Sequence, residues 1–178
     1  MYLSRRLLGC LFFGFGFGFG IIGCGGATDD PATRSLREKY VTVDRLADPI
    51  SLSDAASLFE TNPEDKEPKS LVIVGRIYAG DLDPWERGKA SFVLSELPAE
   101  GHGAGHDADN CPFCKRRAAK APTVIVKFVD DKSETLSIDA RKLFGIETGQ
   151  VVRISGKMVA GELNSLVLIA DKMQIVTR

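Results

Sequence analysis

Residues 150–176 read QVVRISGKMVAGELNSLVLIADKMQIV. Two apolar runs flank the tetrapeptide GELN, whose glycine and asparagine are turn-forming residues. In the first run, Val152, Ile154 and Met158 alternate with the charged Arg153 and Lys157, so one face of the run is apolar. The stretch therefore predicts two strands, 150–160 and 165–176, joined as a hairpin.

Three apolar segments that precede this hairpin also read as strands, over 70–80, 90–97 and 123–129. Gly75 within the first of them suggests a bulge or bend. We expect the core to be built mainly from these strands and the helix before the hairpin, through Val72, Val74, Ile77, Phe92, Leu94, Val124, Val126, Phe144, Val152, Ile154, Leu166 and Leu168.

Two short helices accompany the strands. The segment 51–62 has apolar residues at helical spacing, and Ser51 with Asp54 fits a capping box at its start. The segment DARKLFGI (139–146) lies between the third and fourth strands, with Asp139 as N-cap and Gly145 as stop. The predicted order is therefore three strands, a helix and two strands, with one helix in front.

That order resembles the OB-fold, a five-stranded Greek-key barrel. The segment EPKSLVIVGRIY (67–78) and the terminal hairpin are similar to exported bacterial OB domains of the tRNA-anticodon-binding-like group, over about residues 50–177. The resemblance implies a mainly β barrel with one helix between strands 3 and 4 and a short helix before strand 1. It implies no particular ligand, and another small β-barrel or a split sandwich is the alternative.

The N-terminal segment has the order of a secretory signal: Arg5 and Arg6, then the apolar LLGCLFFGFGFGFGII (7–22). The sequence IIGC (21–24) resembles a bacterial lipobox, which implies a signal peptide over 1–23 and a covalent lipid on Cys24. An ordinary cleaved signal or a weak anchor is the alternative. Residues 4–8 also resemble a twin-arginine signal, so the export route stays open.

On this interpretation, residues 24–50 are the lipidated cysteine and a flexible tether, and 51–177 are the folded domain. Gly25 after the cysteine resembles an outer-membrane address. We therefore expect an exported protein whose lipid anchors it to the membrane, on the outer membrane facing the periplasm. The inner membrane and the cell surface are the alternatives.

The charge balance limits the partners. The chain has 23 Lys and Arg against 24 Asp and Glu, and loss of residues 1–23 removes two arginines and no acid, which leaves 21 against 24, a net charge of −3. Such a balance disfavours general nucleic-acid binding. The sequence shows no nucleophile triad, phosphate loop or dinucleotide fingerprint, so we expect a binding module and no enzyme.

The long connection 98–121 contains HGAGHDADNCPFCKRR (102–117). CPFCK resembles the CPxC knuckle of zinc ribbons and rubredoxin-type sites, and the two histidines complete a frequent structural zinc set. The predicted metal ligands are His102, His106, Cys111 and Cys114, with Asp107 and Asp109 as supporting groups. Zinc is expected and copper is the alternative. The metal would order a loop that presents Lys115–Lys120 to a protein partner.

Two other interpretations of Cys111 and Cys114 remain. CPFC resembles the glutaredoxin active-site tetrapeptide, and the basic residues 115–117 would depress the thiol pKa. A thiol-disulfide or metal-transfer protein is therefore an alternative, although thioredoxin-like folds place this motif after the first strand of a βαβ unit. A plain disulfide is the other possibility.

An OB barrel also offers a face for ligands. The possible ligand face comprises Arg76, Tyr78, Trp85, Lys127 and Arg153. Its aromatic rings, with Phe92 and Phe128, would stack on bases or sugars beside the cationic groups, as in an oligonucleotide or oligosaccharide binder. Packing in the core or at its rim is the competing interpretation for most of these rings.

Overall fold

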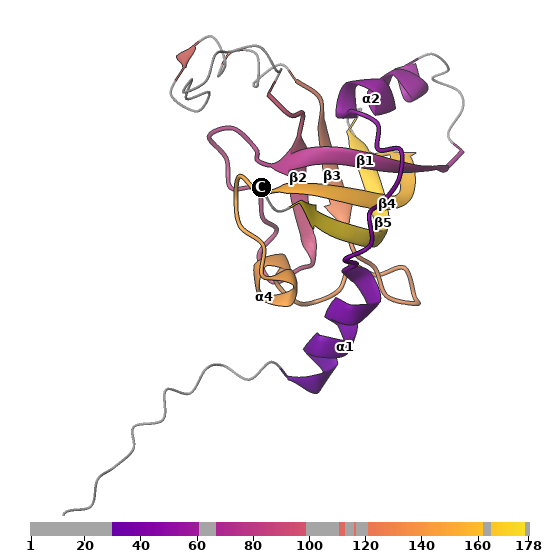
Figure 1. Ribbon diagram of the computed structural model, residues 1–178, viewed down its shortest axis with the longest axis vertical. Coiled ribbons are helices and arrows are strands. Elements are labelled where there is room, and N and C mark those ends of the chain that lie inside the picture. The colour runs from indigo at the N-terminus through magenta and orange to yellow at the C-terminus, as the bar shows by residue number, and fades with distance from the viewer. Residues whose placement is uncertain are drawn as a thin grey trace, which may run out of the picture.

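The computed structural model describes residues 30–60, 67–98, 111–112, 116, 121–161 and 165–176. Its elements in chain order are α1 (Pro31–Tyr40), α2 (Leu52–Glu60), β1 (Lys69–Ile77), β2 (Ser91–Ser95), β3 (Thr123–Lys127), α4 (Ala140–Phe144), β4 (Val151–Ala160) and β5 (Leu166–Val176). The strands close into a barrel in the order β1-β2-β3-β5-β4 (Figure 1).

The strand pairing is that of an OB-fold-like barrel, which confirms the predicted fold class. β3 and β5 are parallel, whereas β1–β2, β2–β3, β4–β5 and the closing β1–β4 pair are antiparallel. A register shift between Ser155 and Gly156 lets β4 and β5 bend around the barrel. The predicted strands and both predicted helices are present.

The local signals at the two predicted helices are confirmed. Asp54 N–H donates to Ser51 Oγ (3.0 Å) at the start of α2, and Ser51 Oγ in turn lies 2.7 Å from Asp54 Oδ2. Asp139 accepts a hydrogen bond from Arg141 N–H at the start of α4, and Gly145 ends that helix with a φ of 67°.

The barrel interior contains most of the predicted core, but of the three core residues predicted on β1 only Ile77 is fully buried. Ile73 and Ile77 are fully buried, whereas Val72 and Val74 are half-buried on the outer side. β1 pairs with β4 without a break from Lys69 to Arg76, so Gly75 marks no bulge. A Cβ at Gly75 would lie 3.0 Å from both Leu52 Cδ1 and Ser95 O, so glycine there lets α2 approach the barrel.

Residues 31–40 form helix α1, so the predicted flexible tether is wrong over this stretch. Tyr40 is 4% exposed, its hydroxyl donates to Val129 O (2.6 Å), and its ring meets Phe128 edge-on at 5.3 Å. Arg37 Nε donates to Leu143 O (2.6 Å), one of the last carbonyls of α4. α1 is therefore fastened to the end of the barrel that α4 also covers (Figure 1).

Residues 41–50, which we call the strap, connect α1 with α2 along the outside of the barrel (Figure 1). Thr42 N–H donates to Met173 O (2.9 Å) at one end of the strap. Ile50 N–H donates to Val72 O (2.9 Å), and Val74 N–H donates to Ile50 O (3.1 Å), at the other end. The strap thus supplies backbone partners to β5 and β1 where neighbouring strands do not reach.

Candidate ligand face on the barrel

The outer surface of β1, β2 and β3 gathers polar and apolar side chains in three rows. Arg76 lies opposite Ser95, which lies opposite Thr123; Ser91 lies opposite Lys127. Between these rows, Tyr78 N–H donates to Val93 O (3.2 Å), and Val93 lies opposite Ile125. We define the ligand face as Arg76, Tyr78, Val93, Ser95, Ile125 and Lys127.

Arg76 and Tyr78 form the centre of the ligand face. The guanidinium carbon of Arg76 lies 4.3 Å from the centroid of the Tyr78 ring, and both side chains are half-buried. A cation at this distance is attracted by the ring and held in place by it. The pair therefore presents a fixed cationic donor group beside an aromatic ring, next to the half-buried Val93 and Ile125.

The Lys127 end of the face carries both signs of charge. Lys89 Nζ lies 2.7 Å from Glu86 Oε1, and the hydrogen bond from Lys89 is the main reason that the pKa of Glu86 lies below its usual range. The positive charge of Lys127 lowers this pKa further, which places Lys127 within electrostatic reach of Glu86. Glu86 thus stays ionised at neutral pH and offsets part of the positive charge.

Ser95 is a polar residue enclosed on this outer face. It is 4% exposed, and its hydroxyl oxygen has no hydrogen-bond partner among the described residues. Buried hydroxyls normally have a partner, because desolvation without one costs roughly 1–3 kcal/mol. Alternation along β2 places Ser91 and Ser95 on the face opposite Phe92 and Leu94, and only the structure shows that both serines are buried.

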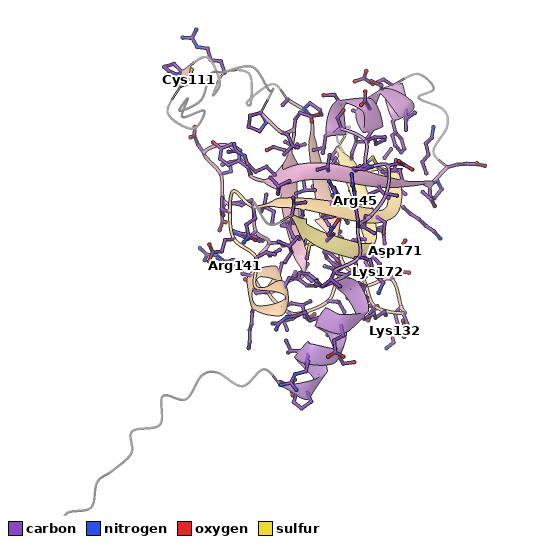
Figure 2. The ribbon with its side chains drawn as sticks, in the orientation of Figure 1. Arg45, Cys111, Lys132, Arg141, Asp171 and Lys172 are labelled. Atoms are coloured by element: carbon purple, nitrogen blue, oxygen red, sulfur yellow. The ribbon has the colours of Figure 1, made fainter. Side chains whose placement is uncertain are left out.

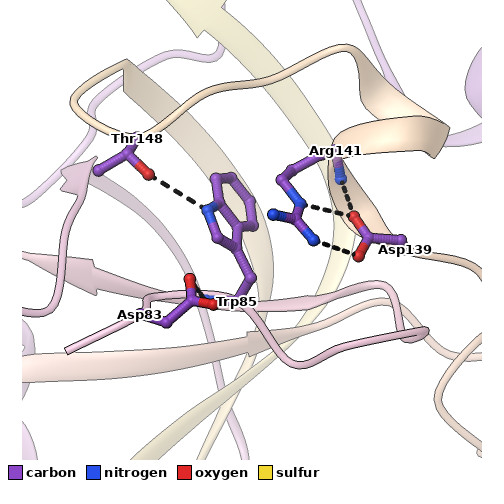
Figure 3. Close-up of polar contacts among 5 residues, drawn as sticks. All are labelled: Asp83, Trp85, Asp139, Arg141 and Thr148. Atoms are coloured by element: carbon purple, nitrogen blue, oxygen red, sulfur yellow. Dashed lines mark hydrogen bonds and ion pairs between the residues drawn. The ribbon is translucent and has the colours of Figure 1, made fainter.

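Trp85 does not join the ligand face, contrary to the sequence-based expectation. The side chain is 9% exposed, and its ring packs 5.7 Å from the Phe92 ring. The indole Nε1–H donates to Thr148 Oγ1 (3.2 Å), as Figure 3 shows. Arg141 lies over the ring at 5.6 Å. Trp85 therefore ties the connection between β1 and β2 to the segment that leads into β4.

Asp139 holds the arginine that lies over this tryptophan. Arg141 donates from Nε (2.9 Å) and from Nη2 (2.7 Å) to the two carboxylate oxygens of Asp139 (Figure 3). These side-chain hydrogen bonds lower the pKa of Asp139 to about 2, against the opposing effect of burial. This ion pair stabilises the start of α4 and is not part of the ligand face.

Arg153 lies opposite Val74 on the β4 side of β1, and its side chain is engaged beside the strap. Its Nη1 donates to Gln174 Oε1 (3.3 Å), and the same oxygen accepts from Leu46 N–H (3.2 Å). Arg153 thus positions a glutamine that holds the strap against β5. Phe92 and Phe128, the other predicted stacking rings, are 1% and 0% exposed and belong to the core.

The predicted metal ligands and anchor fall mostly outside the described residues. These are Cys24, His102, His106, Cys114 and the supporting Asp107 and Asp109. Cys111 is described and is half-buried, on the side of the barrel where β2 ends (Figure 2). Within the described ranges, no group of three His, Cys, Asp or Glu side chains is placed to hold a metal ion. Among the same residues, no helix is long and apolar enough to span a membrane.

Comparison with known proteins adds little beyond the fold. No family model matches the chain, and no curated protein matches it. Among solved structures, the chain is similar to a putative aspartyl-tRNA synthetase from Leishmania major Friedlin, with a TM-score of 0.41 and 11% sequence identity. The match covers 83% of this chain and 26% of that one, so the chain spans about a quarter of its neighbour's length. A likeness of this degree carries neither a ligand nor an activity across.

Proposed function

We propose that the chain is an exported, lipid-anchored binding module, without catalytic activity, that binds an extended ligand on the outer face of β1, β2 and β3. The observation that carries the ligand face is the Arg76–Tyr78 pair, with its 4.3 Å separation. OB-folds bind oligonucleotides and oligosaccharides across this part of the barrel. The amine of the half-buried Lys127 adds a further hydrogen-bonding group to this face.

An acidic oligosaccharide suits this face better than an oligonucleotide does. A sugar ring stacks on Tyr78, while its carboxylate pairs with the guanidinium of Arg76. A long run of phosphates would require several cations in a row, whereas Glu86 lies beside Lys127. The net charge of −3 after loss of residues 1–23 also opposes a polyphosphate ligand.

Titration calorimetry with a linear oligogalacturonate tests the ligand face. We expect Arg76→Ala and Tyr78→Ala each to weaken binding roughly tenfold, the loss of one charge-assisted or stacking contact. Lys157→Ala, a change on the exposed outer side of β4, is the matched control and should bind as the wild type does. If oligothymidylate bound more tightly, and in a salt-dependent way, the ligand would be a nucleic acid and not an oligosaccharide. If all three variants bound the oligogalacturonate with equal affinity, the proposed ligand face would be refuted.

The lipid anchor is proposed because the N-terminal sequence has basic residues first, then an apolar run and then IIGC. Mass spectrometry of the protein purified from membranes should give a chain that begins at Cys24 and carries added acyl mass. Cys24→Ser should remove the added mass and release the protein from the membrane fraction. An unmodified mature cysteine would refute the lipidation.

A zinc ion is also proposed, on the donor chemistry of His102, His106, Cys111 and Cys114. It would give order to a segment too rich in glycine and small residues to bury an apolar face, and that segment would meet a protein partner. Elemental analysis should find about one zinc per chain, lost in Cys111→Ser. If the analysis found copper, the site would be a copper site with the same ligands. If the wild-type protein contained no metal, the proposed metal site would be refuted.

A thiol-disulfide role for Cys111 and Cys114 finds less support. The pair comes between β2 and β3 of an antiparallel barrel, away from the βαβ unit that positions such a motif in thioredoxin-like proteins. A measured thiol pKa for Cys111 near the ordinary value of about 8.5 would argue further against it.

A further inference from the structure

Helix α1 is held on the barrel by buried and hydrogen-bonded side chains, although it directly follows the N-terminal segment. Its last residue, Tyr40, is buried against Phe128, and Arg37 is bonded to the end of α4. Lys172 of β5 also donates to the carbonyl of Lys39. The point at which the chain leaves the folded domain is therefore the first residue of α1, Pro31, and its place on the domain is fixed.

The distance from that point to the proposed lipid is short. Seven residues lead from Cys24 to Pro31, and a fully extended chain of that length spans at most about 25 Å. The ten residues of α1 measure about 15 Å along the helix axis. The ten residues of β4, tilted as barrel strands are, give the barrel a height of roughly 25 Å.

The two ends of the barrel are distinct. α1 and α4 cover the end where Val129 follows β3, and α1 extends away from the barrel there (Figure 1). α2 lies at the other end, where Ser53 N–H donates to Glu96 Oε2 (2.7 Å) just after β2, and Cys111 lies at this end too (Figure 2). The end with α2 is therefore about 40 Å from Pro31. A domain that stood upright on its α2 end would hold Pro31 about 40 Å above the membrane, beyond the reach of about 25 Å from Cys24.

We propose that the α1–α4 end of the barrel faces the membrane that carries the lipid, and that the end with α2 and Cys111 lies farther from that bilayer. This inference rests on the proposed lipidation of Cys24.

Energy transfer to the bilayer tests this orientation. The lipidated full chain, with Cys111→Ser and Cys114→Ser, receives one exposed cysteine, Arg34→Cys in α1 or Glu60→Cys in α2. Each cysteine is labelled with a donor fluorophore, and the protein is reconstituted in phosphatidylcholine vesicles that contain acceptor-labelled head groups. We expect higher transfer from position 34 than from position 60.

A lengthened tether is the matched control. About twenty glycine and serine residues inserted after Ala27 add enough reach for the domain to turn over, so the difference between positions 34 and 60 should be lost. Equal or reversed transfer in the original chain, with the lipid confirmed by mass, would overturn the orientation alone. A mass without lipid would overturn the anchor and the orientation together. A difference that survives the long tether would show that lipid contact, and not tether length, sets the orientation.

Discussion

Replacement of Tyr40 tests whether α1 belongs to the folded domain. The ring is 4% exposed and meets Phe128 edge-on, so Tyr40→Ala removes a buried aromatic side chain and leaves a cavity at the end of the barrel. Such truncations cost about 3–5 kcal/mol of unfolding free energy. Tyr40→Phe keeps the ring and removes only the hydroxyl that donates to Val129 O, which should cost about 1 kcal/mol.

Urea unfolding of the chain that begins at Gly25 measures both changes. Trp85, the one tryptophan of the sequence, is buried and reports the transition by its fluorescence. Glu38→Ala, on the exposed side of α1, is the control and should lie within about 0.5 kcal/mol of the wild type. If Tyr40→Ala fell within the same range, α1 would be a loosely attached segment, and the fixed exit point at Pro31 would be wrong.

Three further perturbations follow from the described contacts. Gly156→Ala should destabilise the barrel by roughly 3 kcal/mol in thermal unfolding, because a Cβ there would lie 2.2 Å from Ile169 O; a neutral result would contradict the register shift. Asp139→Asn removes the charge that binds Arg141. Because the folded-state pKa of Asp139, about 2, lies below the usual value of 3.8, the variant should be less stable than the wild type at pH values well above 3.8. This difference should shrink below that pH and be lost as the pH falls through 2, which acid titration of both proteins measures. The fluorescence of Trp85 should be that of a buried indole and should resist acrylamide quenching until the chain unfolds. Strong quenching in the native state would show that the indole is exposed to solvent and would contradict its packing in the structure.

The sequence was sufficient to predict the buried residues of a strand that has one buried and one solvated face. β4 alternates Val152 and Ile154 with Arg153, and the structure buries the predicted positions. It was sufficient again where a single residue type determines the backbone. Asp139 caps α4 by accepting from a backbone N–H, and Gly145 ends the helix in the left-handed conformation that glycine adopts easily.

The sequence failed where distant segments decide burial. SLVIV in β1 is apolar on both sides because its outer side lies beside the strap, so periodicity could not tell Val72 from Ile73. α1 was missed because its docking depends on Tyr40 and Arg37, whose partners lie 89 and 106 residues away. For Trp85, the sequence could not decide between a ligand face and packing at the rim of the core, because its partner, Thr148, lies 63 residues away.

The composition of the candidate site also depends on segments that are distant in the sequence. Arg76, Tyr78 and Lys127 could be grouped from the alternation of β1 and β3, but only the barrel register joins them with Ser95. Only the structure shows that Arg153 is engaged by Gln174 beside the strap. The His/Cys segment lies outside the described residues apart from Cys111, so its metal stays a prediction.

The strap has a consequence for the order of folding. Thr42 and Leu46 find their partners on Met173 and Gln174, in the last strand of the chain. During synthesis or export from the N-terminus, these early residues must wait until nearly the whole chain is present, and contacts of such long sequence separation form slowly. The strap is thus synthesised early but docks late, and completion of β5 sets the moment at which α1 and the strap take their places on the barrel.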